Sequence, residues 1–243
     1  MAGPNGSIQG PCEAKWGYTT LSAADWDGDG KTDVLVNSIW GKIVWYRNLG
    51  NGDDGLPVLS AAQPVDVEWP GKTPKPSWTW WNPEGKNLVT QWRTTPEAVD
   101  FNKDGLMDLV LLDQEGYLCL FERTREGGLL KLQPPKRIFV DADGKPLRLN
   151  PKNAGGSGRR KTHIVDWDAD GDFDLLTNST NADLYENTGT DEDGNVTLQH
   201  RGPIGQRKLA GHTSSPASLD LDGNGTLDLL IGAEDGHLYL MSR

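Results

Sequence analysis

Acidic side chains recur at every second position of a nine-residue motif, a spacing suited to binding a hard metal cation. The first copy is Asp25-Trp-Asp27-Gly-Asp29-Gly-Lys31-Thr-Asp33, with carboxylates at positions 1, 3, 5 and 9. Calcium takes about six to eight oxygen ligands, and alternate residues of a tight loop can point their oxygens toward one centre. Glycine at position 6 permits the sharp turn because it has no Cβ atom. The motif therefore predicts a calcium-binding loop.

The motif occurs four times, so it is an organising repeat of the chain. We call the copies loop 1 (25–33), loop 2 (100–108), loop 3 (166–174) and loop 4 (220–228). The predicted ligands are the side chains at positions 1, 3, 5 and 9 and the backbone carbonyl at position 7. In chain order they are Asp25, Asp27, Asp29, Lys31 and Asp33; Asp100, Asn102, Asp104, Leu106 and Asp108; Asp166, Asp168, Asp170, Asp172 and Asp174; and Asp220, Asp222, Asn224, Thr226 and Asp228.

About four structural calcium ions are expected, each holding together a turn whose carboxylates would otherwise repel one another. An EF-hand is excluded, because its loop ends with a bidentate glutamate at position 12. The residues at that position here are Val36, Leu111, Thr177 and Ile231. Two alternatives stay open. The loops are polar turns without metal, or a calcium ion is catalytic, although nothing in the motif indicates the open coordination that catalysis needs.

The composition describes a soluble, turn-rich chain with an acidic balance. The formal net charge of −11 argues against nucleic acid or an anionic membrane surface as a partner. Much of that charge lies in the four loops as predicted ligand charge. No apolar run approaches the roughly 18 residues that a membrane helix needs. Millimolar extracellular calcium fills weak sites, which favours an exported protein, extracellular or periplasmic, although no signal peptide is visible.

The two cysteines, Cys12 and Cys119, allow one disulfide at most. The chain is therefore not a disulfide scaffold. Cys119 lies in an apolar alternation and is expected to be a buried thiol, and whether it pairs with Cys12 is left open.

Each loop lies between two short apolar strands, followed by an alternating third strand and a more polar fourth. Units of about 50 to 75 residues with four short strands are typical of β-propeller blades. We therefore predict an all-β fold, a single propeller domain over 1–243. Its approximate blades are 16–75, 92–150, 159–209 and 211–243, with an N-terminal strand near 7–15 completing the last. Either these four blades close a ring, or the chain is part of a larger propeller.

The pattern D-x-[DN]-x-[DN]-G-x-x-D between two hydrophobic strands resembles the FG-GAP repeat, also called the VCBS repeat. It is similar to the calcium-binding blades of the integrin alpha-chain propeller. The segments 41–48 and 230–239 look like those of bacterial secreted VCBS proteins. Many of those proteins accompany polysaccharide-degrading systems. The resemblance implies the fold and the metal, but the fold hosts lectins, adhesins, lyases and scaffolds alike.

Basic residues precede the first strands of the repeats. In related propellers the innermost strand runs toward the calcium loop, so its start lies at the opposite mouth of the channel. The candidates there are Arg93, Arg159, Arg160, Lys161 and His212. Guanidinium groups suit carboxylates and sulfates, which points to an anionic glycan such as a uronate. The alternative is that these residues neutralise neighbouring acids or lie in solvated loops.

Tryptophans are concentrated between 69 and 92, in a long loop rich in proline and asparagine. Trp80, Trp81 and Trp92 are candidates for stacking on a sugar ring, the alternative being that they pack the loop down. Trp26 and Trp167, at position 2 of loops 1 and 3, are expected to pack between blades.

No catalytic motif is recognisable in the sequence. We therefore expect a secreted, calcium-stabilised binding module for carbohydrate, alone or as an accessory part of a larger polysaccharide-processing chain. The first alternative is a polysaccharide lyase or glycoside hydrolase at the channel mouth, with His212, His163 and Arg159 as catalytic candidates. The second is an adhesion propeller that binds an extracellular protein.

Overall fold

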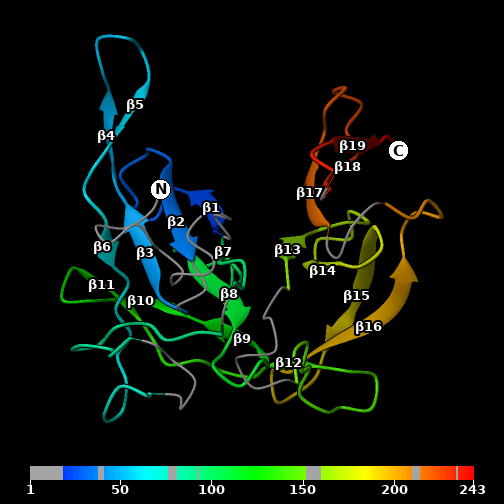
Figure 1. Ribbon diagram of the computed structural model, residues 1–243. Helices are drawn as coiled ribbons and strands as arrows, with labels where there is room; N and C mark the ends of the chain where they lie inside the picture. The colour runs from blue at the N-terminus through cyan, green and yellow to red at the C-terminus, as the bar shows by residue number, and fades with distance from the viewer. Residues whose placement is uncertain are drawn as a thin grey trace. The chain divides into compact units, whose positions relative to one another are not determined.

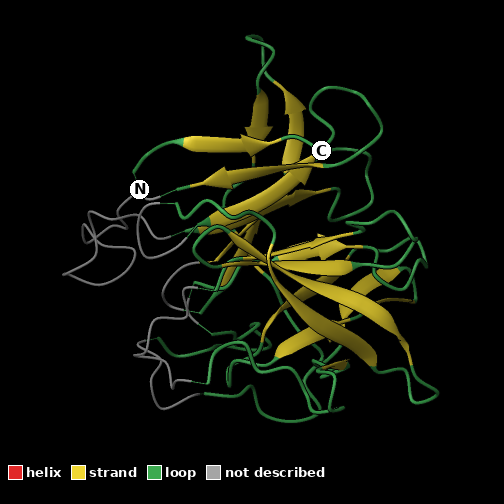
Figure 2. Cartoon of the chain, turned by 90° about the vertical axis from the view of Figure 1, so that its right-hand side faces the viewer, coloured by secondary structure: helices red, strands yellow, loops and turns green. Residues whose placement is uncertain are grey.

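The chain is all-β, as the sequence predicts. The computed structural model describes residues 19–37, 41–75, 81–91, 93–151, 160–209, 214–233 and 235–243. Within these ranges every regular element is a strand, joined to the next by loops and turns (Figure 2). No helix in the described part of the chain is long and apolar enough to cross a membrane.

The chain divides into two compact units, each containing two of the four loops. Unit 1 comprises Met1–Lys136 and Arg148–Gly158, and unit 2 comprises Arg137–Leu147 and Arg159–Arg243. Loops 1 and 2 belong to unit 1, and loops 3 and 4 belong to unit 2. The closed four-bladed ring, and the N-terminal strand near 7–15 that lies outside the described residues, stay predictions.

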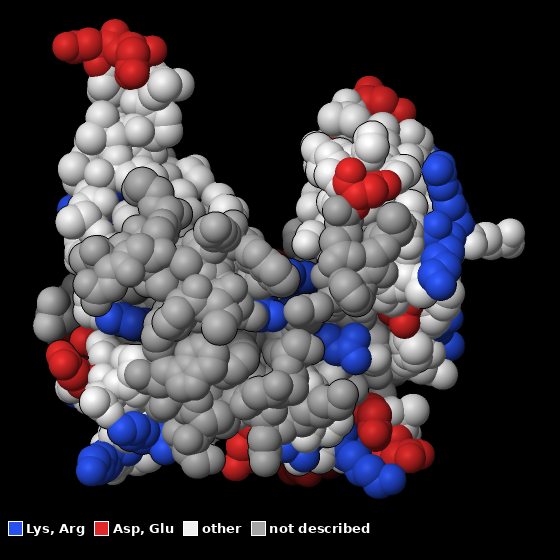
Figure 3. All heavy atoms as spheres, in the orientation of Figure 1, with Lys and Arg blue, Asp and Glu red and all other residues white. Residues whose placement is uncertain are grey.

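The first repeat forms an antiparallel sheet with a protruding hairpin. The sheet has the order β1-β2-β3-β6, from β1 (Thr20–Ala24), β2 (Asp33–Asn37), β3 (Ile43–Tyr46) and β6 (Gln63–Pro64). The hairpin of β4 (Asn48–Asn51) and β5 (Pro57–Leu59) extends beyond β3 (Figure 1). Acidic side chains gather at its tip, where Asp53 and Asp54 lie (Figure 3).

The second repeat, also in unit 1, has three sheet strands and a separate hairpin. The sheet order is β7-β8-β9, from β7 (Glu97–Val99), β8 (Asp108–Leu112) and β9 (Leu118–Phe121). The hairpin consists of β10 (Arg123–Glu126) and β11 (Leu129–Leu132). Strands β8 and β9 are buried along their whole length, as expected for near-continuous apolar runs.

In unit 2 the third repeat builds a five-stranded sheet of order β12-β16-β15-β14-β13. Its strands are β12 (Phe139–Val140), β13 (Thr162–Val165), β14 (Asp174–Asn178), β15 (Ala182–Thr190) and β16 (Val196–Pro203). In this sheet β12 pairs in parallel with β16, and the other described pairs are antiparallel. The fourth repeat forms the sheet β17-β18-β19, from β17 (Ser215–Leu219), β18 (Asp228–Gly232) and β19 (Leu238–Met241). The prediction was four strands per blade. In the described part of the chain the main sheets of the four repeats have four, three, five and three strands, and the first two repeats each add a two-stranded hairpin.

Each unit has an apolar core made by its two repeats together. In unit 1 Trp26 and Leu35 of the first repeat share a buried cluster with Leu109 and Phe121 of the second. In unit 2 the corresponding cluster includes Val165, Trp167 and Leu176 with Leu229 and Ile231. Burial of such side chains contributes roughly 25 cal/mol for each Å² of apolar surface removed from water. This packing confirms the expected position of Trp26 and Trp167 between neighbouring repeats.

Cys119 is one of the core residues of unit 1, and its Sγ lies 3.5 Å from Asp113 Oδ2. Its predicted burial is confirmed. Cys12 lies outside the described residues.

Candidate metal centres

All four loops close the same kind of antiparallel hairpin. In each case the residue before position 1 pairs with the aspartate at position 9. The pairs are Ala24 with Asp33, Val99 with Asp108, Val165 with Asp174, and Leu219 with Asp228. The two strands therefore hold positions 1 and 9 close together, and the residues between them must form a compact loop.

The loop backbone is folded around the side chain at position 1. One oxygen of that aspartate accepts the N–H of the glycine at position 6 in every copy. These N···O distances are 2.9 Å from Gly30 to Asp25, 2.9 Å from Gly105 to Asp100, 3.1 Å from Gly171 to Asp166 and 3.0 Å from Gly225 to Asp220. The N–H of position 5 points to the side chain at position 3, and that of position 7 to position 5. Side chains at positions 1, 3 and 5 thus turn toward the interior of the loop.

Two positions of each loop adopt left-handed backbone conformations. The glycine at position 6 has φ between 84° and 97° in the four copies. Position 4 is also left-handed, although loops 2 and 3 carry Lys103 (φ 60°) and Ala169 (φ 62°) there instead of glycine. A side chain with a Cβ atom is strained in this region. The geometry at position 4 was not predicted, because its residue type varies between the copies.

The aspartate at position 9 is the most buried member of the predicted ligand set. Asp33, Asp108, Asp174 and Asp228 are each at most 3% exposed. One oxygen of each accepts the backbone N–H of a residue that lies just after the third strand or, in loop 3, within it. The donors are Asn48 at 2.6 Å, Arg123 at 2.6 Å, Asn187 at 2.7 Å and Arg243 at 3.1 Å, respectively. The carboxylate therefore ties three strands together at the end of the sheet.

Burial makes these carboxylates costly to keep charged. Desolvation raises the pKa of Asp33, Asp108 and Asp174, and backbone hydrogen bonds offset only part of that effect. Moreover, Asp33 Oδ2 and Asp166 Oδ1 are buried and accept no hydrogen bond in the structure. A buried carboxylate oxygen without a partner is expensive, and a bound cation would compensate it.

The donor set fits a hard divalent cation. Carboxylate oxygens of Asp25, Asp27 and Asp29 lie within 4.8 Å of one another, and so do those of Asp166, Asp168 and Asp174. Calcium prefers oxygen ligands of this kind. Loops 2 and 4 have an asparagine, Asn102 or Asn224, in place of one aspartate. The carbonyl ligands predicted at position 7 stay predictions.

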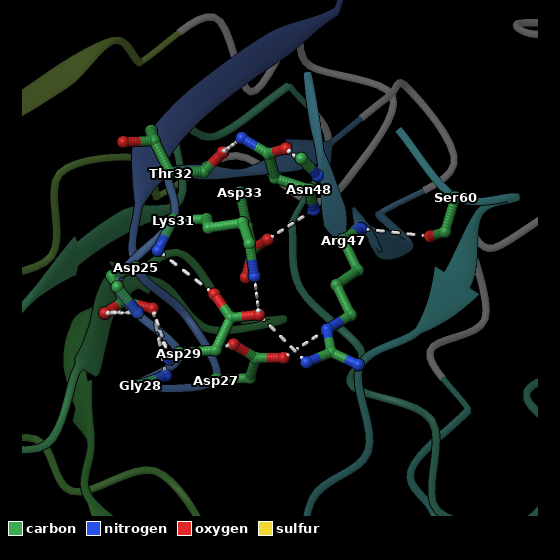
Figure 4. Close-up of polar contacts among 12 residues, drawn as sticks. Asp25, Asp27, Gly28, Asp29, Lys31, Thr32, Asp33, Arg47, Asn48 and Ser60 are labelled. Carbon is green, nitrogen blue, oxygen red and sulfur yellow. Dashed lines mark hydrogen bonds and ion pairs between the residues drawn. The ribbon is translucent and has the colours of Figure 1, made fainter. Parts of the chain in front are cut away.

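In loop 1, basic side chains lie on the carboxylates (Figure 4). Arg47 Nη2 is 2.9 Å and Lys31 Nζ is 2.8 Å from Asp29 Oδ2, and Arg47 Nε is 2.6 Å from Asp27 Oδ2. The hydrogen bond from Lys31 lowers the pKa of Asp29, and the same carboxylates raise the pKa of Arg47. The sequence did not reveal the role of Arg47, which lies 18 residues after Asp29.

Arginines of the second and fourth repeats stack on the tryptophans of the first and third. The Arg123 guanidinium carbon lies 3.6 Å from the centre of the Trp26 ring, and that of Arg243 lies 4.1 Å from the Trp167 ring. Arg243 also donates to the Trp167 carbonyl at 2.8 Å. Burial lowers the pKa of Arg123 to about 10. Each unit thus links its two repeats by an arginine–tryptophan contact beside a loop.

Four of the eight predicted glycan-binding residues lie in the described part of the chain. Arg93 is 2% exposed and its backbone is left-handed, with φ at 53°, so in this structure it does not present its side chain at the surface. Arg160 and Lys161 are half-buried just before β13. Trp81 is half-buried, with Lys42 Nζ 5.5 Å from the centre of its ring. Arg159, His212, Trp80 and Trp92 lie outside the described residues.

Of the two catalytic histidine candidates, His163 is described. Its Nε2 lies 2.9 Å from Ser218 Oγ, on the neighbouring repeat of unit 2. The contact joins β13 to β17, so the imidazole lies between two strands. This position agrees with a structural side chain of an inner strand. A catalytic role for His163 stays a prediction.

Comparison with known proteins supports the repeat. Residues 25–111 match the family model of the FG-GAP-like repeat. The matched segment runs from the first residue of loop 1 into β8, so it includes loops 1 and 2. No curated protein shows a significant match to the chain.

Proposed function

We propose that the loops bind calcium and that the calcium-stabilised repeats form a binding module, because residues 25–111 match the FG-GAP-like repeat. The observation that carries the proposal is the buried carboxylate at position 9, repeated in four hairpins. In two loops a carboxylate oxygen also lies buried without a hydrogen-bond partner. Bound calcium would supply the positive charge that these oxygens lack.

The predicted ligands of such a site have different roles. Positions 1, 3 and 5 supply exposed or half-buried oxygens, and their backbone hydrogen bonds fix the direction of each side chain. Position 9 supplies a carboxylate already anchored to the third strand. A calcium ion would then join the loop to the sheet, which is a structural role and not a chemical one. Weak sites of this type fill at extracellular calcium concentrations, so we place the protein outside the cytoplasm.

A thermal melt tests the calcium part of this proposal. Protein stripped of metal should melt at a higher temperature when calcium is added, because a ligand that binds only the folded state stabilises it. Magnesium at the same concentration is the control, since its small octahedral shell dehydrates reluctantly. Identical melting temperatures with calcium and with chelator would contradict the proposal.

For the recognised ligand we propose an anionic carbohydrate. The supporting observation is the placement of Arg160 and Lys161 immediately before β13, whereas loop 3 follows the other end of that strand. Metal and ligand would therefore occupy opposite ends of the same strand. Guanidinium and ammonium groups can bind the carboxylates of a uronate or the sulfates of a sulfated glycan.

Calorimetric titration with a polyuronate tests the carbohydrate part. Binding should weaken in the double variant Arg160→Ala and Lys161→Ala. The matched control is Lys145→Ala with Lys208→Ala, which removes two charges from exposed positions of the same unit. Equal affinity of the two variants would contradict the assignment. Release of unsaturated sugar during the titration would show a lyase instead of a binding module.

A further inference from the structure

Loops 1 and 3 have the same arrangement of predicted side-chain ligands, with aspartate at positions 1, 3, 5 and 9 in both. Both have tryptophan at position 2, and both position-9 aspartates accept an N–H from an asparagine, Asn48 in one and Asn187 in the other. The asparagine side chains also donate equivalently, to the carbonyls of Thr32 and Phe173. The two loops therefore form a matched pair within one chain.

This pairing makes the surroundings of the two loops directly comparable. The residue before the asparagine is Arg47 in the first repeat and Glu186 in the third. Position 7 is Lys31 in loop 1 and Asp172 in loop 3. At both places a cation beside loop 1 is replaced by an acid beside loop 3.

The cations of loop 1 lie on its predicted ligands. Arg47 reaches across from the end of β3 and contacts both Asp27 and Asp29, while Lys31 contacts Asp29 from within the loop (Figure 4). The carboxylates are only 20% exposed, so the ion pairs are partly shielded from water. Two of the four aspartates are thus neutralised by the chain itself.

Loop 3 has no such compensation within the described part of the chain. None of its aspartates forms an ion pair there with lysine or arginine. Glu186 turns instead to Arg201, with N···O distances of 2.7 and 3.2 Å. Asp166 Oδ1 is buried and accepts no hydrogen bond, whereas its counterpart Asp25 Oδ1 accepts two, from Gly28 and Asp29.

We propose that Arg47 and Lys31 are built-in counter-cations that compete with calcium at loop 1, so that loop 3 is the tighter calcium site. This inference rests on the proposed calcium binding and adds which residues set the affinity. At loop 1 an incoming ion must displace the guanidinium and ammonium groups from Asp27 and Asp29. At loop 3 the ion meets carboxylates that no lysine or arginine of the described residues pairs with.

The difference also predicts two distinct responses to low calcium. Loop 1 can keep Asp27 and Asp29 compensated without metal, because the backbone of Arg47, between β3 and β4, is held by hydrogen bonds to Ser60. The buried Oδ2 of Asp33 is left without a hydrogen-bond partner there. Loop 3 depends on the ion for that compensation. Arg47 and Lys31 therefore determine affinity without themselves being ligands, and removing them should strengthen binding.

Terbium luminescence can report the two loops separately. Tb³⁺ substitutes for calcium and is sensitised by a nearby indole, and Trp26 or Trp167 directly follows the first ligand of each loop. The variant Trp167→Phe leaves the indole of loop 1, and Trp26→Phe leaves that of loop 3. Phenylalanine is the natural residue at this position of loop 2. Calcium displacement of Tb³⁺ then gives the affinity of each loop.

The decisive variants exchange the two environments. In the Trp167→Phe background, Lys31→Asp with Arg47→Glu should tighten calcium binding at loop 1 by about tenfold or more, since each charge contributes a few-fold at these distances. In the Trp26→Phe background, Asp172→Lys with Glu186→Arg should weaken loop 3 by a similar factor. Lys145→Asp with Lys208→Glu, at two exposed positions outside both loops, is the charge-matched control.

The outcomes separate this inference from the proposal on which it rests. Binding at both loops with equal affinity, unchanged by the exchange, would overturn the role of Arg47 and Lys31 and leave calcium binding intact. Absence of any calcium-displaceable signal would overturn both. Circular dichroism of each variant tests whether the fold is retained. If the double exchange does not fold, the neutral change Arg47→Gln should still give an intermediate increase in the calcium affinity of loop 1.

Discussion

The two units of the chain follow one plan with different degrees of burial and charge compensation. In each, an odd-numbered repeat supplies a tryptophan and an even-numbered repeat supplies an arginine that covers it. Arg123 of unit 1 is 8% exposed, whereas Arg243 of unit 2 is exposed. Loop 1 of unit 1 also has two cations on its carboxylates, whereas loop 3 of unit 2 has none from the part of the chain that the structure describes. The comparison indicates that the carboxylates of one loop type can be compensated by side chains of the protein in one copy and can require a bound ion in another.

The largest effect is expected from removing the charge of a position-9 aspartate. Asp174→Asn keeps one oxygen for the Asn187 N–H but weakens the metal site. In saturating calcium it should lower the free energy of unfolding by about 2–3 kcal/mol, the stabilisation that a ligand gives at roughly 100 times its Kd. In chelator the loss should be smaller, because only the hydrogen bond from the Trp167 N–H to the second oxygen is then lost. Urea unfolding in both solutions measures this.

Asp33→Asn is the matched comparison in unit 1. It should show a smaller dependence on calcium than Asp174→Asn, because Arg47 and Lys31 already compensate loop 1. Equal calcium dependence of the two variants would break the comparison between the units.

A medium effect is expected from the arginines that cover the tryptophans. Arg123→Ala should lower the free energy of unfolding by about 2 kcal/mol, since a desolvated cation–π contact and its packing are lost. Arg243→Ala should cost only about 0.5–1 kcal/mol, as is usual for an exposed contact. The exposed neighbour Arg125→Ala is the control and should be near neutral. A larger loss for Arg243 than for Arg123 would refute burial as the deciding factor.

The smallest effect concerns the backbone of position 4. Ala169 of loop 3 has φ at 62°, where loops 1 and 4 have glycine. Ala169→Gly should stabilise the protein by about 0.5 kcal/mol, because relief of the left-handed strain exceeds the entropy cost of glycine. Gly28→Ala in loop 1 is the reverse test and should destabilise by a similar amount. Thermal unfolding of both variants with calcium present checks the sign.

The loops and strands were predictable from sequence because their signals are local. Alternating oxygens, a glycine at position 6 and flanking apolar runs all lie within about 20 residues. The strands that flank each loop, the turns after them and the packing of Trp26 and Trp167 follow from these patterns.

The remaining features depend on contacts between segments that are distant in sequence. Arg47 reaches back over loop 1, and Arg123 reaches a tryptophan almost a hundred residues earlier. No repeating pattern in the sequence indicates which distant residues these arginines contact. The burial of Arg93 was missed for the same reason, since position before a strand says nothing about what packs over it. The varied residues at position 4 hid a backbone conformation common to all four loops.

Calorimetric titration of metal-free protein with calcium tests the central claim most directly. We predict saturable binding at several sites, with the tightest component lost in Asp174→Asn and retained in Asp33→Asn. The absence of binding heat up to millimolar calcium, confirmed at a second temperature, would show that the four loops are not calcium sites and would contradict the account.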